Sequence, residues 1–554
     1  MPTKFIPFVD TPSIMPGLDI RGLSNSAADI TDAFNGYFDV WQNNSEEGRR
    51  LKFVLRPKTI DSSLSLNTTN ADQVINGWIS SLDRTRLYFV LTGTGGPLFR
   101  YWDGTTTNNV AMTAGWSNTQ GTKFDYLDGI SYGANNYFVA TDFAKGAVLT
   151  NAGVWTEIVS ATYTGLTTKT NILPLDGYLF CGDGTTNRIY NSDLNVPGTW
   201  TATSFVTSAD NPGKLLWLGR IRNYLVAFKQ YSIEFWEDVG NPTPGSPLEA
   251  QKQLNRRIGL YSTSSMQEVS DGIIFLGVTQ SGKISTYKIE RDTLTIKDIG
   301  NTQVKWGLNN YFEVPALFSS YLNFPKTTSY IGVSQVINYK NKEFYCVSFA
   351  SSKASSVTYL FDNELGVWVR WFSHFGSSAS DTDGFFLPSQ CVTLKTDSQY
   401  IGPVFAKNFH GTGTTFASTI QKVDPAPSSS IGELISFGFT TDFLDLNTGT
   451  RKFIDSLEIL YELEYGASTS GATVLQFDLQ YYDKSFKSTA ATTRSISIKD
   501  TGSTRAIYRQ LGNFRSRAFL ISTTYNSPTT FGTAHELAIC GFWLTYNDGE
   551  TDQS

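Results

Sequence analysis

The sequence predicts an all-β protein, with a β-propeller of six or seven blades followed by a C-terminal antiparallel β-sandwich. Aromatic residues make up 14% of the 554 residues and charged residues only 17%, a balance that favours strands around a large core over helices or disorder. Short apolar segments recur in pairs, and each pair is joined by a tight polar turn. The turns fall near positions 84, 135, 176, 222, 271 and 340. A spacing of about 40 to 50 residues is typical of four-stranded propeller blades, although an array of β-sandwiches is the alternative.

The turns themselves indicate hairpins. Asp176-Gly177 and Asp271-Gly272 each separate two short apolar segments, and Lys340-Asn341 lies between two longer ones. Gly, Asn and Asp tolerate the positive φ that a two-residue hairpin turn needs. A seventh unit, at about 385–415, has the weakest pattern of apolar segments. The number of blades therefore stays at six or seven.

Three parts follow one another along the chain. We expect residues 1–60 to form an extended N-terminal arm and a first strand, 61–420 the propeller, and 431–554 a sandwich that serves in assembly. Four prolines among the first 16 residues favour an extended arm. The segment Asp424–Ser430 has the composition of a linker. Beyond it the apolar segments lengthen and the blade spacing ends, as in an antiparallel sandwich.

Charge and cysteine content exclude several classes of protein. The 44 Lys and Arg residues against 50 Asp and Glu give a net charge of −6. A tight grip on nucleic acid is not expected, because phosphate binding needs clustered positive charge. The four scattered cysteines suit a reducing compartment rather than a disulfide framework. The N-terminus lacks the apolar stretch of a signal peptide, and no apolar run approaches 18 residues. We expect synthesis in a cytoplasm and no membrane insertion by the protein itself.

No catalytic constellation emerges from the motifs. His535-Glu536 opens the H-E-x-x-H pattern of zinc proteases, but Ile539 stands where the second histidine is required. There is no phosphate-binding P-loop and no G-x-S-x-G nucleophile elbow. A glycosidase needs two carboxylates about 5–10 Å apart across a cleft, whereas Glu462 and Glu464 are more simply one solvated face of a strand. We therefore expect no enzymatic activity, no catalytic residue, no metal and no cofactor.

Two basic segments are candidate assembly contacts. Strand alternation places the basic side chains of the first segment on the face opposite its apolar side chains. The candidate residues are Arg50, Lys52 and Arg56 in the first segment, and Arg509, Arg515 and Arg517 in the second. Positive charge on an exposed edge strand also discourages edge-to-edge pairing by itself. Both interpretations stay open: edge protection, or docking of subunits through pairs of Arg and carboxylate.

An ordered set of strand segments resembles a known family. The segments that carry the resemblance are Tyr224–Phe228, Ser232–Trp236, Arg257–Leu260, Asp271–Gly277 and Tyr359–Asp362, followed by Trp368 and Trp371. In this order they resemble the tail nozzle proteins of short-tailed bacteriophages (podoviruses), which are also called packaged-DNA stabilisation or head-closure proteins. The resemblance is strongest over about 215–375, and no single motif in it is catalytic.

The resemblance implies a structural virion protein of the viral tail, made in the host bacterial cytoplasm. It implies a hexameric nozzle ring below the portal and adaptor rings, which extends the DNA channel, retains packaged DNA and opens for genome ejection. The implied partners are other copies of the chain, the adaptor ring and tail fibre or tailspike proteins. Double-stranded DNA would pass through the lumen without sequence-specific binding, and a mildly acidic wall would let it slide. A receptor-binding or glycan-cleaving tail component is the alternative, and a cellular propeller scaffold is another.

A closed channel needs a constriction, and one loop is the candidate. The segment Gly240–Leu254 follows a strand and is rich in Pro and Gly, so we expect it to project as a loop. Its prolines would stiffen it against pressurised DNA. The candidate gate residues are Asn241, Pro242, Thr243, Pro244, Gly245, Ser246 and Pro247. A plain surface loop is the simpler interpretation.

Overall fold

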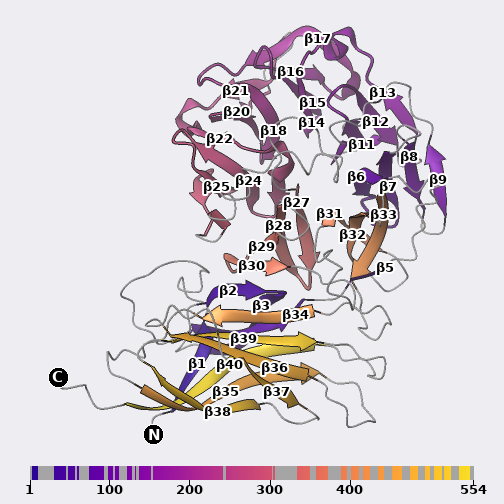
Figure 1. Cartoon of the computed structure of the whole chain (residues 1–554). Coiled ribbons are helices and arrows are strands. Elements are labelled where there is room, and N and C mark those ends of the chain that lie inside the picture. The colour runs from indigo at the N-terminus through magenta and orange to yellow at the C-terminus, as the bar shows by residue number, and fades with distance from the viewer. Residues whose placement is uncertain are drawn as a thin grey trace.

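The computed structural model describes the chain as a series of strand-rich segments. The described residues are 3–9, 30–44, 48–56, 59–61, 74–92, 98–103, 106–110, 116, 122–127, 132, 136–150, 154–240, 245–301, 304–305, 333–349, 357–371, 388–395, 401–410, 416–423, 435–441, 452–464, 475–483, 493–498, 505–514, 517–525 and 536–548. In these segments nearly every element is a strand, as the composition predicts (Figure 1).

The propeller begins with four antiparallel sheets of four strands each, which follow one another along the chain from β6. Blade one is β6 (Val74–Ser80), β7 (Leu87–Thr92), β8 (Leu98–Trp102) and β9 (Thr107–Val110). Blade two is β10 (Lys123–Tyr126), β11 (Asn136–Thr141), β12 (Gly146–Thr150) and β13 (Trp155–Glu157). Blade three is β14 (Lys169–Leu175), β15 (Tyr178–Asp183), β16 (Arg188–Asp193) and β17 (Val196–Thr207), with α1 (Ala161–Thr164) before it. Blade four is β18 (Leu215–Ile221), β19 (Tyr224–Lys229), β20 (Ile233–Asp238) and β21 (Leu248–Ala250).

Three more blades complete the propeller. Blade five is β22 (Ile258–Leu260), β23 (Gln267–Val269), β24 (Gly272–Thr279), β25 (Ile284–Glu290) and β26 (Ile296–Asp298), with the short 3₁₀ helices η1 (Lys252–Leu254) and η2 (Thr263–Ser265) beside it. Blade six is β27 (Val333–Tyr339), β28 (Lys342–Phe349), β29 (Val357–Asp362) and β30 (Val367–Trp371). Blade seven is β31 (Pro388–Lys395), β32 (Ile401–His410), β33 (Phe416–Val423) and β5 (Thr59–Asp61).

The seven blades form a closed ring. Each blade contacts the next, and β31 of blade seven contacts β6 of blade one, as the ring in Figure 1 shows. The last strand of blade seven comes from the other end of the propeller sequence, because β5 pairs with β33. The described residues therefore contain seven blades, and the predicted fold class of a propeller with a C-terminal sandwich is confirmed.

The hairpin turns have the backbone conformations that the sequence predicts. Asp176 and Gly177 have φ of 46° and 84°, and Lys340 and Asn341 have φ of 47° and 63°. Positive φ at both central residues is the signature of the turn type whose twist matches the flanking strands. These turns fix the register of each blade and hence which side chains face the neighbouring blades.

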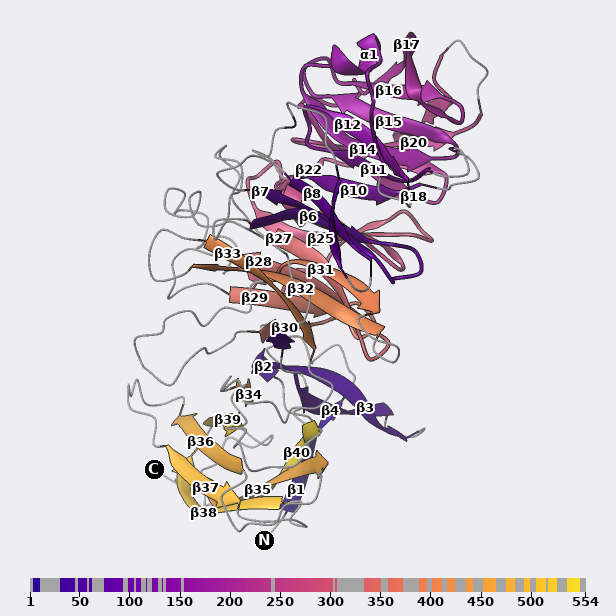
Figure 2. The same cartoon turned by 90° about the vertical axis from the view of Figure 1, so that its right-hand side faces the viewer.

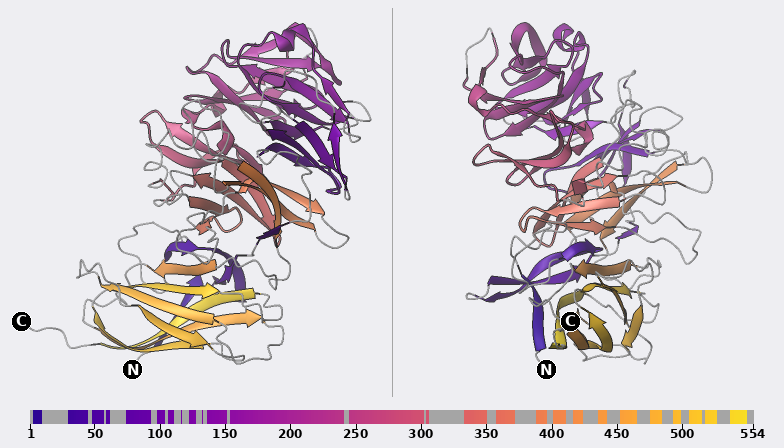
Figure 3. Two further views of the ribbon diagram at one scale, coloured as in Figure 1. Left: turned by 45° about the vertical axis from the view of Figure 1, so that its right-hand side comes forward. Right: turned by 60° about the vertical axis from the view of Figure 1, so that its left-hand side comes forward.

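The sandwich consists of two sheets to which both halves of the chain contribute. One sheet has the order β3-β4-β1-β40-β35-β38, and the other contains β2-β34-β39-β36-β37. Their bounds are β1 (Thr3–Val9), β2 (Ile30–Phe34), β3 (Gly36–Asn44), β4 (Gly48–Leu55), β34 (Ile435–Thr441), β35 (Lys452–Glu464), β36 (Leu475–Asp483), β37 (Arg494–Ile498), β38 (Arg505–Phe514), β39 (Arg517–Tyr525) and β40 (Glu536–Asp548). Figures 2 and 3 show the sandwich at the rim of the propeller, next to β30.

The N-terminal strands differ from the extended arm that the sequence predicts. Thr3 to Pro7 in β1 pair with Thr545 to Gly541 in β40, which closes the sheet between the two ends of the chain. β40 lies more than 500 residues after β1 in the sequence, so no local pattern could reveal this pairing. The propeller is thus inserted between the N-terminal and the C-terminal strands of the sandwich.

One core runs through the junction between the two domains. Strand β2 pairs in parallel with β30 of blade six, and this pairing joins that blade and the sandwich in a single sheet. The same cluster of buried side chains contains Phe344 and Trp371 of blade six together with Phe53, Phe437 and Phe542 of the sandwich. A continuous apolar core of this kind holds two domains in one orientation, unlike a small polar interface.

Candidate functional site

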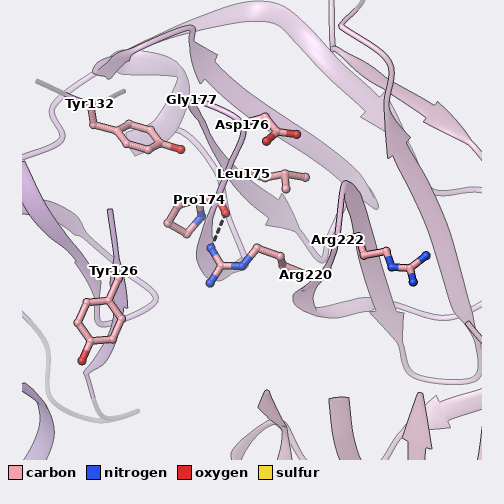
Figure 4. A pocket seen from close by; sticks show the side chains of 8 residues that line it. All are labelled: Tyr126, Tyr132, Pro174, Leu175, Asp176, Gly177, Arg220 and Arg222. Atoms are coloured by element: carbon pink, nitrogen blue, oxygen red, sulfur yellow. Dashed lines mark hydrogen bonds between the residues drawn. The ribbon is translucent and has the colours of Figure 1, made fainter. Parts of the chain in front are cut away.

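A partly open pocket lies at the inner strands of the propeller. It has a volume of about 270 Å³ and lies where blades two, three and four meet (Figure 4). Its lining residues are Tyr126, Tyr132, Pro174, Leu175, Asp176, Gly177, Arg220 and Arg222. Most of them stand at the ends of innermost strands or in the hairpin turns that follow, which is where the blade geometry brings successive blades together.

Arg220, near the end of β18 in blade four, contacts three other blades. Its Nη1 donates a hydrogen bond to the carbonyl oxygen of Pro174 in blade three at 3.0 Å. Its Nη2 lies 3.5 Å from Asp125 Oδ1 in blade two and 3.4 Å from Glu268 Oε2 in blade five. One guanidinium therefore joins the innermost strands of four successive blades, which suits the fixed fork of donors on Arg.

Neutral hydrogen bonds tie the same strands together. The side-chain amide of Asn171 in blade three exchanges two hydrogen bonds with the backbone of Leu218 in blade four, at 2.9 and 2.8 Å. Gln267 in blade five donates to the carbonyl oxygen of Ser334 in blade six at 2.8 Å. The Tyr126 hydroxyl donates to the Ser80 carbonyl oxygen in blade one at 3.0 Å. Adjacent blades therefore meet through satisfied polar groups as well as apolar packing.

Burial sets the charge state of Asp125. It raises the pKa of the Asp125 carboxyl to about 6, against the opposing effect of Arg220, and Glu268 raises this pKa further. Burial also lowers the pKa of Lys123, whose Nζ lies 5.6 Å from the centre of the Trp217 ring. The pKa of Asp125 still lies below neutral pH, so its carboxylate is ionised there although burial favours the protonated form.

The pH dependence of stability should carry the signature of Asp125. Its pKa is higher in the folded chain than in the unfolded chain, so the folded chain binds the proton more tightly and loses stability as pH rises from about 4 to about 6. Replacing Asp125 by Asn should remove this loss and raise the free energy of unfolding at pH 7 by about 2 kcal/mol or less. Urea unfolding curves at pH 4.5 to 7.5 measure the free energy of unfolding of both proteins. If this free energy changes with pH equally in the wild type and in the variant, the assignment to Asp125 is contradicted.

The pocket side chains are engaged in the fold rather than poised for chemistry. Figure 4 shows Tyr126 and Arg222 pointing away from the pocket centre, and Arg222 pairs with Asp292 at 2.6 Å. Tyr132 donates its hydroxyl to the Tyr178 carbonyl oxygen at 2.7 Å, and burial raises its pKa. No group of three or more His, Cys, Asp or Glu side chains within the described segments could hold a metal ion. What this arrangement can do chemically is hold blades together.

The basic residues of the first strand make contacts within the chain. Lys52 pairs with Glu462 of β35 at 3.2 Å. Arg56 is only 1% exposed, and its Nε donates to Asn35 Oδ1 at 3.1 Å. Strand alternation was expected to place both on an exposed face, but Arg56 follows the end of β4 and turns inward. The side chain of Arg50 lies outside the described residues.

The arginines of the second basic segment also differ in exposure. Arg509 is exposed on β38, an edge strand of its sheet. Arg517 is 2% exposed, donates a hydrogen bond to the Leu511 carbonyl oxygen at 2.5 Å and lies over the Tyr481 ring at 4.3 Å. Arg515 lies outside the described residues. A charge reversal at Arg517 would therefore bury a carboxylate, and of the two described arginines of this segment Arg509 is the one suited to probe docking.

The described part of the candidate gate packs against blade four. Asn241, Pro242, Thr243 and Pro244 lie outside the described residues, whereas Ser246 and Pro247 are buried. Immediately after them, Leu248–Ala250 forms β21 and pairs with β20, so this part does not project as a loop. The prolines of the segment gave no information on the strand that follows.

A buried ion pair in blade four was not anticipated. Lys229 and Glu234 approach to 3.2 Å, with side chains 0% and 2% exposed. Lys229 also donates to the Ser208 carbonyl oxygen at 2.8 Å, and Glu234 accepts hydrogen bonds from the Ser208 hydroxyl and the Asn211 N–H. The signal that could have found the pair is a lone Glu inside the apolar strand Ser232–Trp236. A charged residue there must be paired, because an isolated buried charge is very costly.

The cysteines of the described segments are free thiols. Burial raises the pKa of Cys181, Cys346 and Cys540 to about 12, so these groups stay protonated and unreactive. In the part of the chain that the structure describes, no helix has the length and apolar character to cross a membrane.

A family model matches part of the chain. Residues 108–320 match a phage stabilisation family that is described as "Bacteriophage P22 Gp10, beta-propeller". The matched region covers blades two to five in full. Together with the observed propeller, the match supports a structural phage protein of the head-closure or tail type, and hence a virion component. No curated protein matches the sequence.

Solved structures resemble the chain only distantly. The WD40 domain of coronin from Toxoplasma gondii is 7% identical, with 72% of this chain and 89% of that chain covered and a TM-score of 0.36. BamB from Moraxella catarrhalis is 10% identical, with 59% and 89% covered and a TM-score of 0.32. The periplasmic gluconolactonase PpgL of Pseudomonas aeruginosa is 11% identical, with 60% and 94% covered and a TM-score of 0.36. Similarities this low carry no argument about function.

Proposed function

We propose that the protein is the nozzle of a phage tail, a ring that extends the DNA channel below the portal and adaptor. In this role it closes the channel after packaging, retains the genome and opens for ejection. The observation that carries the proposal is the match of residues 108–320 to the phage stabilisation propeller family. The ordered strand segments from Tyr224 to Trp371, which resemble nozzle proteins, extend beyond that match.

The inner strands support a channel between subunits rather than through one propeller. Arg220 reaches Asp125 and Glu268 at 3.5 and 3.4 Å, so one side chain spans the space between blades two and five. A DNA double helix is wider than its major groove, which alone measures about 12 Å, so it does not fit between blades two and five. A DNA conduit built from this chain therefore needs several copies around a common axis, and we propose a hexameric ring.

The charge of the chain suits passage of DNA without retention. A net charge of −6 gives no overall attraction for phosphate, so a polyanion would slide along such a wall. The proposed partners are other copies of the chain, the adaptor ring, tail fibre or tailspike proteins, and the passing duplex.

We propose no enzymatic role. A glycan-cleaving tail component would need two carboxylates facing each other across a sugar-binding cleft. Asp125 and Glu268 instead share the guanidinium of Arg220, which lines the described pocket. The two tyrosines that line this pocket are already hydrogen-bonded. This arrangement gives the receptor-binding or glycan-cleaving alternative no support.

The test is the fate of packaged DNA in particles assembled without the protein. We expect such heads to fill normally and then to lose their DNA, which becomes sensitive to added nuclease. Adding back the purified protein should restore retention, and electron microscopy should show the added ring below the adaptor. Stable, full heads without the protein, or a monomer that never forms a ring on tails, would overturn the proposal.

A further inference from the structure

A single buried residue, Asn35, connects three parts of the molecule. It separates β2 from β3, has a φ of 54° and is 0% exposed. Its backbone N–H donates to the carbonyl oxygen of Arg370 in blade six at 2.7 Å, and its carbonyl oxygen accepts from the Arg56 N–H at 2.9 Å. The Arg56 Nε donates to Asn35 Oδ1 at 3.1 Å. We call Asn35, Arg56, Arg370 and Trp371 the Asn35 hub.

Trp371 completes the hub from the side of the propeller. It is the last residue of β30, is 2% exposed, and donates its Nε1–H to the Gly36 carbonyl oxygen at 2.8 Å. Gly36 immediately follows Asn35, so blade six contacts two consecutive residues of the sandwich. Buried hydrogen bonds of this kind are costly to break one by one, because each broken bond leaves an unsatisfied group inside the protein.

The hub lies close in sequence to the outer strand of blade seven. β5 begins at Thr59, three residues after Arg56, and only Thr59, Ile60 and Asp61 pair with β33. Three residues of chain span at most about 11 Å. Once Arg56 moves farther than this from the position of Thr59, β5 must leave blade seven. A three-residue strand has little stability of its own to resist the pull.

We propose that the Asn35 hub is a latch that makes the pairing of β5 with blade seven conditional on contact between the propeller and the sandwich. Moving the sandwich away from blade six breaks the hub and releases β5 from β33. Blade seven is then left with three strands, while blades three and four keep their structure. This device is independent of the proposed function, because it follows from the hub contacts alone.

Hydrogen exchange in a minimal variant tests the latch. Asn35→Gly keeps a residue that tolerates positive φ and keeps both backbone hydrogen bonds, but removes the amide that holds Arg56. We expect amide exchange in β33 to become at least tenfold faster, with exchange in β14 and β15 of blade three unchanged. Asn195→Gly is the matched control, since Asn195 also has a positive φ of 59° but lies exposed in blade three. It should leave β33 unchanged.

Two further measurements test the latch independently. Arg56→Lys retains the charge and shortens the donor, and should accelerate exchange in β33 in the same selective way. In the unmodified protein at rising urea concentration, β33 should open together with β2 and before blades three and four. Unchanged protection of β33 in both variants, or equal loss of protection in all blades, would exclude a latch.

Discussion

Replacing Glu234 by Ala should lower the free energy of unfolding of the propeller by about 3–5 kcal/mol. The substitution leaves the Lys229 ammonium buried without its carboxylate, and uncompensated buried charge is the most costly outcome of breaking such a pair. It also leaves the Ser208 hydroxyl and the Asn211 N–H without the acceptor that now holds them. Urea unfolding followed by tryptophan fluorescence measures the loss.

Two comparisons separate the ion pair from packing alone. Glu249→Gln, at an exposed position on β21 of the same blade, should change the free energy of unfolding by no more than about 0.5 kcal/mol. The double variant Lys229→Met with Glu234→Leu should recover part of the stability, since apolar side chains of similar size often replace a buried pair without loss. The rest stays lost, because the Ser208 and Asn211 groups that bind the pair keep no partner. A single variant as stable as the wild type would show that the pair contributes nothing to the fold.

Replacing Arg220 by Met should cost about 3 kcal/mol. The value lies at the low end for a buried pair, because about a third of the Arg220 side chain remains exposed. Without the guanidinium, Asp125 and Glu268 face each other with no cation between them, and blade three loses a donor to its Pro174 carbonyl oxygen. The same urea experiment measures the effect.

The pH profile distinguishes this cluster from a simple packing defect. The pKa of Asp125 should rise further in the Arg220→Met variant, because Arg220 is the group that most lowers it. The stability lost as pH rises from mildly acidic to neutral should therefore grow, and adding Asp125→Asn should remove most of this loss. A loss that is the same at pH 5 and pH 7 would assign the effect to packing. Arg222→Met, whose partner Asp292 is largely exposed, is the matched control and should cost less than about 1 kcal/mol.

Local signals carried the prediction of the blades. Asp176-Gly177 and Lys340-Asn341 both adopt the left-handed conformations that their residue types favour, and the apolar segments on either side pair as hairpins. A hairpin is specified by neighbouring residues, so the sequence alone can reveal it. The weak seventh unit is also present, as β31, β32 and β33.

Long-range pairing set the limit of the prediction. Neither the closure of blade seven by Thr59–Asp61 nor the pairing of β1 with β40 has a local signature. The same holds for the site: Arg220 is a single charge in an otherwise apolar strand, and its partners come from three other blades. Alternation along one strand likewise could not tell that Arg56 and Arg517 turn into the protein.

The insertion of the propeller into the sandwich has a consequence for synthesis. Thr3 pairs with Thr545, and Thr59 pairs with Val423, so neither domain can close until the ribosome has passed those later residues. At about 5–20 residues per second, the first strands wait from about half a minute to two minutes without partners. Unpaired strand edges invite association with other chains during that interval. Nascent chains of this protein should therefore depend on chaperones, and truncated chains that end before β40 should be the ones that aggregate.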